Sequence, residues 1–209
     1  MQNIPITLAT FVKNEAHCLE NMLQSVNGYV HELIIVDTGS TDGTQDIARK
    51  YTNRVYEIGF TDFGKIRTAT AHLSSSPWIL MLDADETLER PDLLQKCIQI
   101  TKGKENKPVE AIAFPRKRWL DLTMTQQTEL EAYPDWQVRL FQNVPHHIFR
   151  RSLHEEFHGG IVTEISEGPC IHHFQDVFKN TTRNKIREEL YSKLASFAGV
   201  TVHGGKPIC

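Results

Sequence analysis

Short apolar runs alternate with segments of helical periodicity through the first hundred residues of the chain. The apolar runs are rich in β-branched residues and occupy residues 4–12, 32–37, 54–58 and 78–82. A helix is predicted after each of them, at 19–26, at 45–51, at 65–74 and after Pro91. Strands that alternate with helices predict an α/β fold, in which a mostly parallel sheet carries helices on both faces.

The second half of the chain is less regular. We expect strands at 111–114, 138–141, 161–165 and 170–174, and a helix from Asn180 whose apolar stripe comprises Ile186, Leu190, Leu194 and Phe197. The polar stretch at 101–108 is expected to be a surface loop.

One domain accounts for the length of the chain. Of its 209 residues 40% are hydrophobic, which is enough for a sizeable core and too many for a disordered chain. We expect a single domain at 1–200, with a first half at 1–100, a second half at 101–178 and a C-terminal helix at 179–200. Residues 201–209 contain adjacent glycines and no periodicity, and are expected to form a loose tail.

Charge and composition exclude several classes of function. The formal net charge is −3 with both signs interspersed, which leaves no electrostatic footprint for nucleic acid. No run approaches the roughly 18 apolar residues of a membrane span, so no transmembrane segment is expected, and the N-terminus does not resemble a signal peptide. The four cysteines have no CxxC spacing, which argues against a zinc site or a disulfide framework and makes the cytoplasm the expected location.

Polar clusters follow three of the predicted strands. They are Lys13-Asn14-Glu15, Asp37 and Asp83-Ala84-Asp85-Glu86. Ligands of open α/β sheets bind beyond the carboxyl ends of the strands, so these clusters are expected to face one crevice. Each alone is compatible with a turn or a helix cap. Together they place like charges on one rim, where the charges repel unless a cation is present.

Asp83 and Asp85 are two residues apart at a strand end, where both carboxylates can point toward one position. A hard divalent cation such as Mg²⁺ or Mn²⁺ takes oxygen ligands of this kind and keeps positions free for water and phosphate. Asp-x-Asp also occurs by chance, and it is the position after the apolar run at 78–82 that makes a metal site the favoured interpretation.

The order and spacing of these segments resemble glycosyltransferase family 2. Residues 34–44 (IIVDTGSTDGT) resemble the second-strand segment of the family, 13–15 the end of its first strand, and 78–86 its metal-binding Asp-x-Asp segment. Arg139-Leu140-Phe141, His154-Glu155 and His172-His173 resemble later segments of a compact subgroup that includes lipopolysaccharide-core glucosyltransferases. The resemblance implies the GT-A fold, with a nucleotide-sugar-binding half at 1–100 and an acceptor half at 101–178.

The resemblance also implies how the donor is held. The chain from Thr10 to Glu15 would close over the base, Asp37 would contact the base or ribose, and Asp83 would approach the ribose. Arg67 would meet the donor phosphates, although the family usually has Asn next to this Arg and Thr68 departs from that. The alternatives are a helix-capping role for Asp37 and a solvated helix face for Arg67.

By the same resemblance, Asp85 would bind the Mg²⁺ or Mn²⁺ ion that bridges both donor phosphates, and a late histidine would add a metal or phosphate contact. Because side chains alternate along a strand, only one of His172 and His173 can face the site. The sequence leaves open which one, and a structural histidine is the alternative for both.

Family 2 enzymes invert the anomeric centre, so the acceptor hydroxyl needs a general base. Glu155 is preferred, and Asp135 and Glu156 are the alternatives. Three aromatic residues could line an acceptor groove or pack in the core, namely Trp119, Tyr133 and Trp136.

The expected function is transfer of a sugar from a nucleotide-diphosphate donor, a UDP-sugar in the first instance, to a hydroxyl of a glycan or glycolipid acceptor. Synthesis of lipopolysaccharide or another cell-surface polysaccharide would use such an enzyme. The basic helix from Asn180 would either touch the inner face of the membrane or form a solvated surface. Two other functions compete: a nucleotidyltransferase, which would need a glycine-rich loop that Phe11–Glu15 lacks, and an inactive nucleotide-sugar-binding module.

Overall fold

The computed structural model describes residues 4–102, 109–128, 133–178, 181–198, 202–203 and 206–207. The first half of the chain supplies four neighbouring parallel strands, which are β1 (Ile6–Val12), β2 (Glu32–Asp37), β3 (Val55–Glu57) and β4 (Trp78–Met81). Each lies within a predicted apolar run. Because their carboxyl ends point the same way, the segments that follow β1, β2 and β4 gather at one edge of the sheet.

The second half extends the same sheet. Its strands are β6 (Val109–Arg118), β7 (Asp135–Gln142), β10 (Ile161–Glu164) and β11 (Cys170–His173), and they are joined by β5 (Glu86–Glu89). Within the described residues the order is β3-β2-β1-β4-β7-β6-β11-β5, with β10 also paired to β6. Only β7 and β5 run antiparallel to their neighbours in this sheet, so the predicted α/β fold with a mostly parallel sheet is confirmed.

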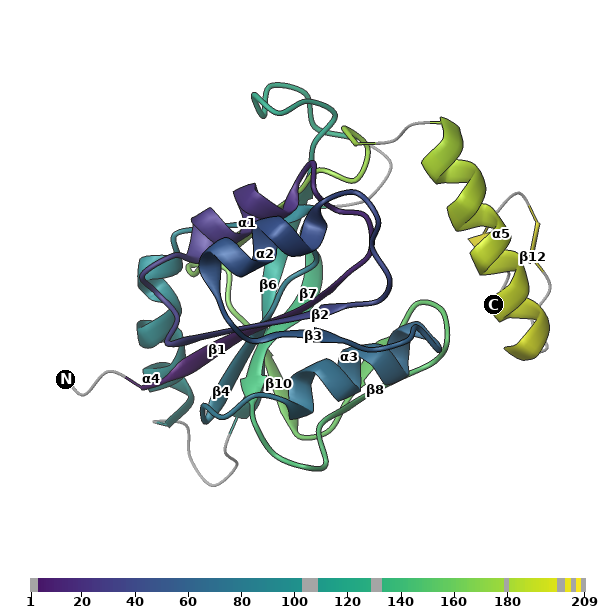
Figure 1. The fold of residues 1–209 in the computed structure, drawn as a ribbon. Coiled ribbons are helices and arrows are strands. Elements are labelled where there is room, and N and C mark those ends of the chain that lie inside the picture. Colours follow the sequence, from purple (N-terminus) through teal and green to yellow (C-terminus); the bar gives the residue numbers. More distant parts are fainter. Residues whose placement is uncertain are drawn as a thin grey trace.

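Helices cover both faces of the sheet (Figure 1). One face carries α1 (Leu19–Val26), α2 (Thr44–Tyr51) and α4 (Leu94–Lys102), which follows a short 3₁₀ turn at Pro91–Leu93. The other carries α3 (Phe63–His72) and the hairpin of β8 (Ile148–Arg150) and β9 (Glu156–His158).

Alternation along β1 explains why the sheet is covered on both sides. Ile6, Leu8 and Val12 pack in the larger core with α1 and α4, whereas Ala9 packs in the smaller core under α3. The apolar stripe of α1 is completely buried, and each side chain of this size contributes about 1.5–3 kcal/mol on burial. The predicted continuous apolar strands are therefore strands that are buried on both faces.

Several elements differ from the expectation. β5, β8 and β9 were not predicted, because three or four residues with charged neighbours carry too little periodicity to be recognised. The expected loop at 101–108 begins with the last turn of α4, and its remaining residues lie outside the described part of the chain. In the expected tail, β12 (Val202–His203) pairs with β13 (Lys206–Pro207).

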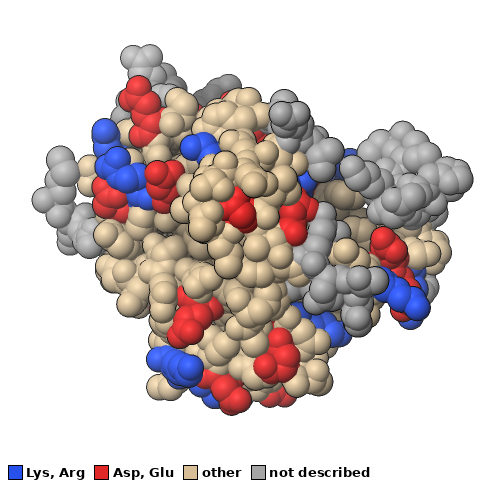
Figure 2. Space-filling model, turned by 90° about the horizontal axis from the view of Figure 1, so that it is seen from above, with Lys and Arg blue, Asp and Glu red and all other residues tan. Residues whose placement is uncertain are grey.

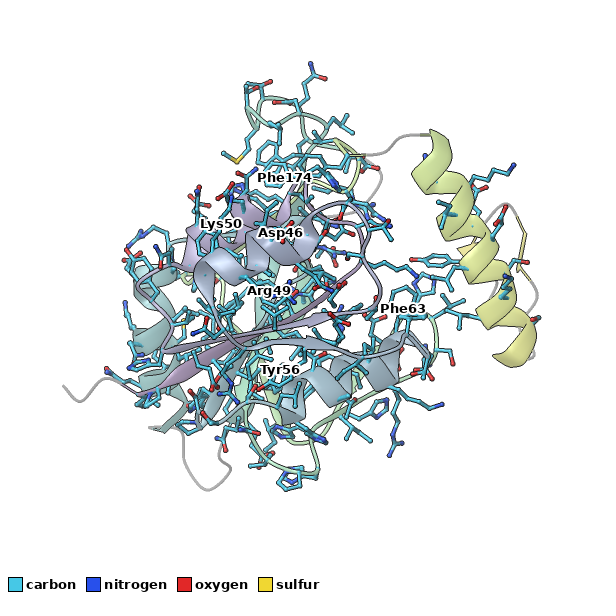
Figure 3. The ribbon with its side chains drawn as sticks, in the orientation of Figure 1. Asp46, Arg49, Lys50, Tyr56, Phe63 and Phe174 are labelled. Atoms are coloured by element: carbon cyan, nitrogen blue, oxygen red, sulfur yellow. The ribbon has the colours of Figure 1, made fainter. Side chains whose placement is uncertain are left out.

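The C-terminal helix α5 (Thr181–Ala198) lies at the side of the molecule, next to the start of α3 (Figure 1). The ring of Tyr191 on α5 is 6.0 Å from Phe63 and 6.4 Å from His154. Figure 3 shows Phe63 on the side of α3 that faces α5. Of the expected apolar stripe Leu194 is buried and Ile186 is exposed, so the stripe is only partly covered.

The cysteines and the helices bear on the expected absence of a disulfide framework and of a transmembrane segment. Cys18, Cys97 and Cys170 are buried and take part in no disulfide, and burial raises the pKa of Cys97 to about 11. Across the described ranges, every helix is too short or too polar to span a bilayer.

Candidate active site

Two loops that follow β1 and β2 are hydrogen-bonded to each other. Asn14 adopts a left-handed φ of 56°, and its side-chain oxygen accepts a hydrogen bond from the Thr41 amide at 2.7 Å. The amide of Asn14 donates to Ser40 Oγ at 2.8 Å, and the amide of Glu15 donates to Thr44 Oγ1 at 2.8 Å. The segments of the chain proposed to hold the nucleotide are therefore fixed against each other before any ligand binds.

Asp37 organises the second of these loops. Its side chain accepts hydrogen bonds from the amide of Ser40 at 3.0 Å, from Ser40 Oγ at 2.6 Å and from Gln45 Nε2. Asp37 is 1% exposed, and both carboxylate oxygens are engaged. These contacts stabilise the turn after β2. They do not cap α2, whose N-cap residue is Gly43.

Thr10 and Glu15 lie at different depths on β1 and the loop after it. Thr10 is 1% exposed, and its Oγ1 has no hydrogen-bond partner among the described residues. Glu15 is half-buried next to Cys18 and His17, and its Oε2 accepts a hydrogen bond from Cys18 Sγ at 3.2 Å. Of these two residues, Glu15 is the one whose polar side chain lies near the surface.

Asp83 lies between two arginines. Arg67 Nη2 donates to Asp83 Oδ1 at 2.6 Å, and Arg139 Nη2 donates to Asp83 Oδ2 at 3.0 Å. Burial alone would raise the pKa of Asp83, but the charges of Arg67 and Arg139 outweigh it and hold the pKa well below its ordinary value. Asp83 is therefore a carboxylate at every physiological pH.

These contacts belong to a longer series of alternating charges, which we call the charge chain. Its members in order are Glu155, Arg67, Asp83, Arg139, Glu86, Arg116 and Asp135. Arg139 binds the fully buried Glu86 through Nε at 2.9 Å and Nη2 at 2.7 Å. A buried charge is costly unless it is paired, and the alternation pairs each of these groups with an opposite charge.

The charge chain changes the interpretation of the acidic rim. The sequence suggested that the acidic residues after β4 repel one another unless a cation is present. Three arginines supply the positive charge instead, from α3, β6 and β7. A metal is therefore not needed merely to hold Asp83 and Glu86 together.

Arg67 is not a solvated side chain on a helix face. It is 4% exposed, and its guanidinium lies 5.3 Å from the centre of the Phe11 ring and 5.4 Å from that of Phe149. Cation–π contacts of this kind hold the guanidinium in place. Its Nη1 has no hydrogen-bond partner within the described part of the chain.

The two adjacent histidines of β11 have different surroundings. His173 Nε2 is 3.6 Å from Asp85 Oδ1, and the ring is buried with no described partner for Nδ1. His172 has Trp119 Nε1 donating to its Nδ1 at 3.0 Å and Glu89 Oε2 at 3.0 Å from its Nε2. The structure brings His173 to Asp85 and leaves His172 with both ring nitrogens engaged elsewhere.

The three candidate bases differ in how many oxygens are free. Glu155 accepts both contacts from Arg67 through Oε1, at 2.9 and 2.8 Å, and no hydrogen bond to a described residue involves its Oε2. Asp135 has both oxygens engaged, one by Arg116 at 2.7 Å and one by Gln137 at 2.7 Å. Glu156 is half exposed on the hairpin and pairs with Arg151.

The three aromatic residues do not form one surface. Trp119 is half-buried and stacks on His172 with ring centres 5.6 Å apart. Tyr133 is 53% exposed beside Lys117, and Trp136 is half-buried on β7. Only Tyr133 is open enough to meet a large acceptor.

Sequence reasoning gave Arg139 and Arg116 no role of their own in the site and included Glu86 only as a member of an acidic cluster. Arg139 was noted only within a family segment, although an arginine between Val138 and Leu140 in a buried strand requires a carboxylate partner. That signal was present, but it could not identify Glu86 as the partner, because the pairing depends on the position of the unpredicted β5.

The charged residues of the visible face are mixed. In Figure 2 the coloured acidic and basic side chains are scattered over the surface, and among them no continuous basic patch appears.

The chain is similar in sequence to several known proteins. The family model described as glycosyl transferase family 2 matches residues 7–156. A TPR repeat-containing protein of Synechococcus elongatus is 32% identical over 152 residues, which are 72% of this chain and 34% of that protein. The SPbeta prophage-derived glycosyltransferase SunS of Bacillus subtilis is 30% identical over 112 residues, which are 52% of this chain and 24% of SunS. The chain thus spans about a third or less of the curated relatives that it matches.

Solved structures share the fold at low sequence identity. TarS of S. aureus in complex with UDP is 12% identical with a TM-score of 0.59, and the match covers 92% of this chain and 66% of that one. Glucosyl-3-phosphoglycerate synthase of Mycobacterium tuberculosis with Mg²⁺ and UDP is 15% identical with a TM-score of 0.56, over 96% of this chain and 82% of that one. These likenesses support the GT-A type of fold.

Proposed function

The chain belongs to glycosyltransferase family 2, and on that premise we propose that it transfers a sugar from a UDP-sugar to an acceptor hydroxyl with inversion at the anomeric carbon. The observation that carries the proposal is the edge after β4, where Asp83 is fixed by two arginines and Asp85 faces His173. UDP bound to the structural neighbour TarS supports the choice of nucleotide.

A divalent cation fits the Asp85 end of this edge. Asp85 offers a carboxylate oxygen and His173 an imidazole nitrogen 3.6 Å away, and the buried Nδ1 of His173 leaves the ring without another described partner. Carboxylate oxygens suit both Mn²⁺ and Mg²⁺, and imidazole nitrogen is a ligand of transition-metal ions. Asp85 and His173 would hold the ion, which supplies positive charge to the diphosphate as the sugar leaves. A structural neighbour was solved with Mg²⁺ and UDP.

The charge chain would position the reacting groups. Arg67 and Arg139 fix the Asp83 carboxylate, which we propose as the contact of the ribose, and Arg67 also orients Glu155 through one oxygen only. With its guanidinium buried, Arg67 acts mainly as a positioning residue rather than as a direct clamp of phosphate. Preorganised charges of this kind need no rearrangement during the reaction.

Glu155 is the proposed general base. Its Oε2 would accept the proton of the acceptor hydroxyl while the hydroxyl oxygen bonds to the anomeric carbon and the bond from that carbon to the diphosphate breaks. Asp135 is a poorer candidate, because Arg116 and Gln137 occupy both of its oxygens. Thr10 and Glu15 are proposed to shape the nucleotide site, and Asp37 is proposed to contact the base or ribose from the turn that it stabilises.

The acceptor is proposed to be a glycan or glycolipid used in cell-surface polysaccharide or lipopolysaccharide synthesis. The resemblance of Arg139-Leu140-Phe141 and His172-His173 to the lipopolysaccharide-core subgroup supports it. Tyr133, exposed beside Lys117, offers an aromatic face on which a sugar ring could stack.

Nucleotide release tests the reaction class. The protein is incubated with a panel of sugar nucleotides, Mn²⁺ and candidate acceptors, and the released nucleotide is identified. We expect nucleoside diphosphate from the wild type and at least tenfold less from Asp85→Asn. Pyrophosphate would instead indicate a nucleotidyltransferase, and binding without turnover would indicate an inactive module.

A second experiment tests the base. Glu155→Gln keeps the shape of the side chain and removes its basicity, so transfer to the acceptor should fall by about 10²–10⁴-fold while donor binding is retained. Glu156→Gln changes the neighbouring, half-exposed carboxylate at the start of β9; it is the matched control and should transfer normally. Normal transfer by Glu155→Gln together with loss in Asp135→Asn would move the base to Asp135.

A further inference from the structure

Glu110, His146 and His147 form a cluster away from the candidate active site. Glu110 Oε2 lies 3.2 Å from His146 Nε2 and 2.9 Å from His147 Nε2. One ligand atom from each residue lies within 4.8 Å of the other two. Zinc–nitrogen bonds of about 2.0–2.1 Å in a tetrahedral site put neighbouring ligand atoms about 3.3 Å apart, which is close to the two measured separations.

The surroundings of His147 leave one nitrogen for a metal. His147 Nδ1 lies 2.7 Å from the backbone carbonyl oxygen of Gln142. A carbonyl only accepts hydrogen bonds, so Nδ1 carries the proton and Nε2 is the nitrogen that points to Glu110. Metal-bound histidines typically have this contact, in which the distal N–H is fixed by a backbone carbonyl.

The cluster of Glu89, Cys170 and His172 is of similar size but lacks this arrangement. There Trp119 Nε1 donates to Nδ1 of His172, so Nε2 carries the proton and donates to Glu89. Neither nitrogen of His172 has a lone pair left for a metal. The contrast identifies His147, and not His172, as the histidine prepared for coordination.

The chain is also shaped around the first cluster. His147 is buried against Phe141 and Phe157, and it follows a turn in which its amide donates to the Val144 carbonyl. Gly159 and Gly160 pass directly alongside. A Cβ on Gly160 would lie 2.0 Å from Glu110 Oε2, and one on Gly159 would lie 2.6 Å from Cδ2 of His147. Two successive glycines therefore allow the backbone to close over Glu110 and His147.

This cluster lies at the edge of the sheet opposite the candidate active site. Glu110 is at the beginning of β6, where Ala111 pairs with Phe141 of β7, and Phe141 pairs with Ile79 near the start of β4. The acidic residues of the active site follow the other end of β4. A metal here is therefore separate from the ion proposed for Asp85.

We propose that Glu110, His146 and His147 bind a divalent transition-metal ion, zinc in the first instance, with one coordination position open to water. Two imidazoles and one carboxylate suit Zn²⁺. The ion would join the start of β6 to the turn between β7 and β8, and so stabilise the smaller core beneath α3. The accessible position of His146, whose side chain is 61% exposed, gives the ion a path from solvent.

Metal binding to the full-length chain tests the proposal. Metal-depleted protein is titrated with Zn²⁺ by calorimetry and with Co²⁺ by absorption spectroscopy. We expect Zn²⁺ binding that is at least tenfold weaker in His146→Gln and in Glu110→Gln. Zinc at about 100 times its Kd should raise the unfolding midpoint of the wild type by about 5–10 °C. His158→Gln on the neighbouring strand β9 is the matched control, and it should bind like the wild type.

Two further measurements distinguish zinc binding at this cluster from binding at Asp85 or at a cysteine. Asp85→Asn should retain this zinc binding, because that residue lies at the opposite edge of the sheet. The Co²⁺ spectrum should lack a thiolate charge-transfer band, whereas binding at Cys18 or Cys170 would produce one. Equal Zn²⁺ affinity in the wild type and His146→Gln, or a thiolate band, would overturn the proposal. His146 is exposed, so its variant is expected to fold, and thermal unfolding without metal verifies this.

Discussion

Asp37 and Asp83 both follow a buried parallel strand, yet the protein stabilises them in different ways. Asp37 is held by an amide, a hydroxyl and a side-chain amide, all neutral groups within eight residues of it. Asp83 is held by the guanidinium groups of Arg67 and Arg139, which lie 16 and 56 residues away. The first carboxylate shapes a local turn, whereas the second joins three parts of the chain.

The difference has a physical consequence. Neutral donors from one turn form together with the turn, so removing Asp37 disturbs little else. Each arginine of the charge chain neutralises two acidic groups, so removing Arg139 leaves Asp83 and the buried Glu86 each with one counter-charge fewer. The region around Asp83 should therefore be the more sensitive and the more cooperative of the two.

The largest effect on stability is expected from Arg139→Met. This change keeps an unbranched side chain but leaves the fully buried Glu86 and the Asp83 carboxylate with one counter-charge fewer. The free energy of unfolding in denaturant should fall by about 3–5 kcal/mol. Arg90→Met removes the exposed pair with Asp92 and should leave the free energy of unfolding nearly unchanged. Similar losses in the two variants would show that the charge chain is no more sensitive than an exposed ion pair.

A smaller effect is expected from Asp83→Asn, with a pH dependence that identifies its cause. The pKa of Asp83 is lowered from its ordinary 3.8, so its ion pairs contribute stability above that pH and lose it as the pH falls below. The variant should lose about 1.5–3 kcal/mol at pH 7. Below pH 4 the stabilities of wild type and variant should converge. A gap that stays constant down to pH 2 would show that the charge of Asp83 is not what stabilises the fold.

The smallest effect is expected from Asp37→Ala. The hydrogen bonds that Asp37 accepts come from neutral groups close in sequence, and their loss should lower the free energy of unfolding by about 0.5–1.5 kcal/mol net. Combined with Arg139→Met, the two losses should add to within about 0.5 kcal/mol, because the residues share no partner. Asp83→Ala combined with Arg139→Met should cost clearly less than the sum. Equal coupling in both pairs, measured by denaturant unfolding, would argue against two independent regions.

The same comparison explains how far the sequence predicts the molecule. Apart from β5, the strands and α-helices up to residue 102 follow from apolar periodicity, and the turn that Asp37 stabilises follows from local turn residues. β5 was missed, and with it the register that pairs His173 with Glu86 and so brings His173 rather than His172 to Asp85. Partners such as Arg139 and Asp83 are brought together only by the order of strands in the sheet, which local patterns do not encode.

Cation-dependent binding of UDP tests the central claim most directly. Calorimetry would measure the Kd of UDP with and without Mn²⁺ for the wild type, Asp85→Asn and the control Glu156→Gln. We predict that Mn²⁺ tightens UDP binding at least tenfold, about 1.4 kcal/mol, in the wild type and the control, and that Asp85→Asn loses most of this gain. A Kd that is the same with and without Mn²⁺, or an undiminished Mn²⁺ effect in Asp85→Asn, would contradict the account.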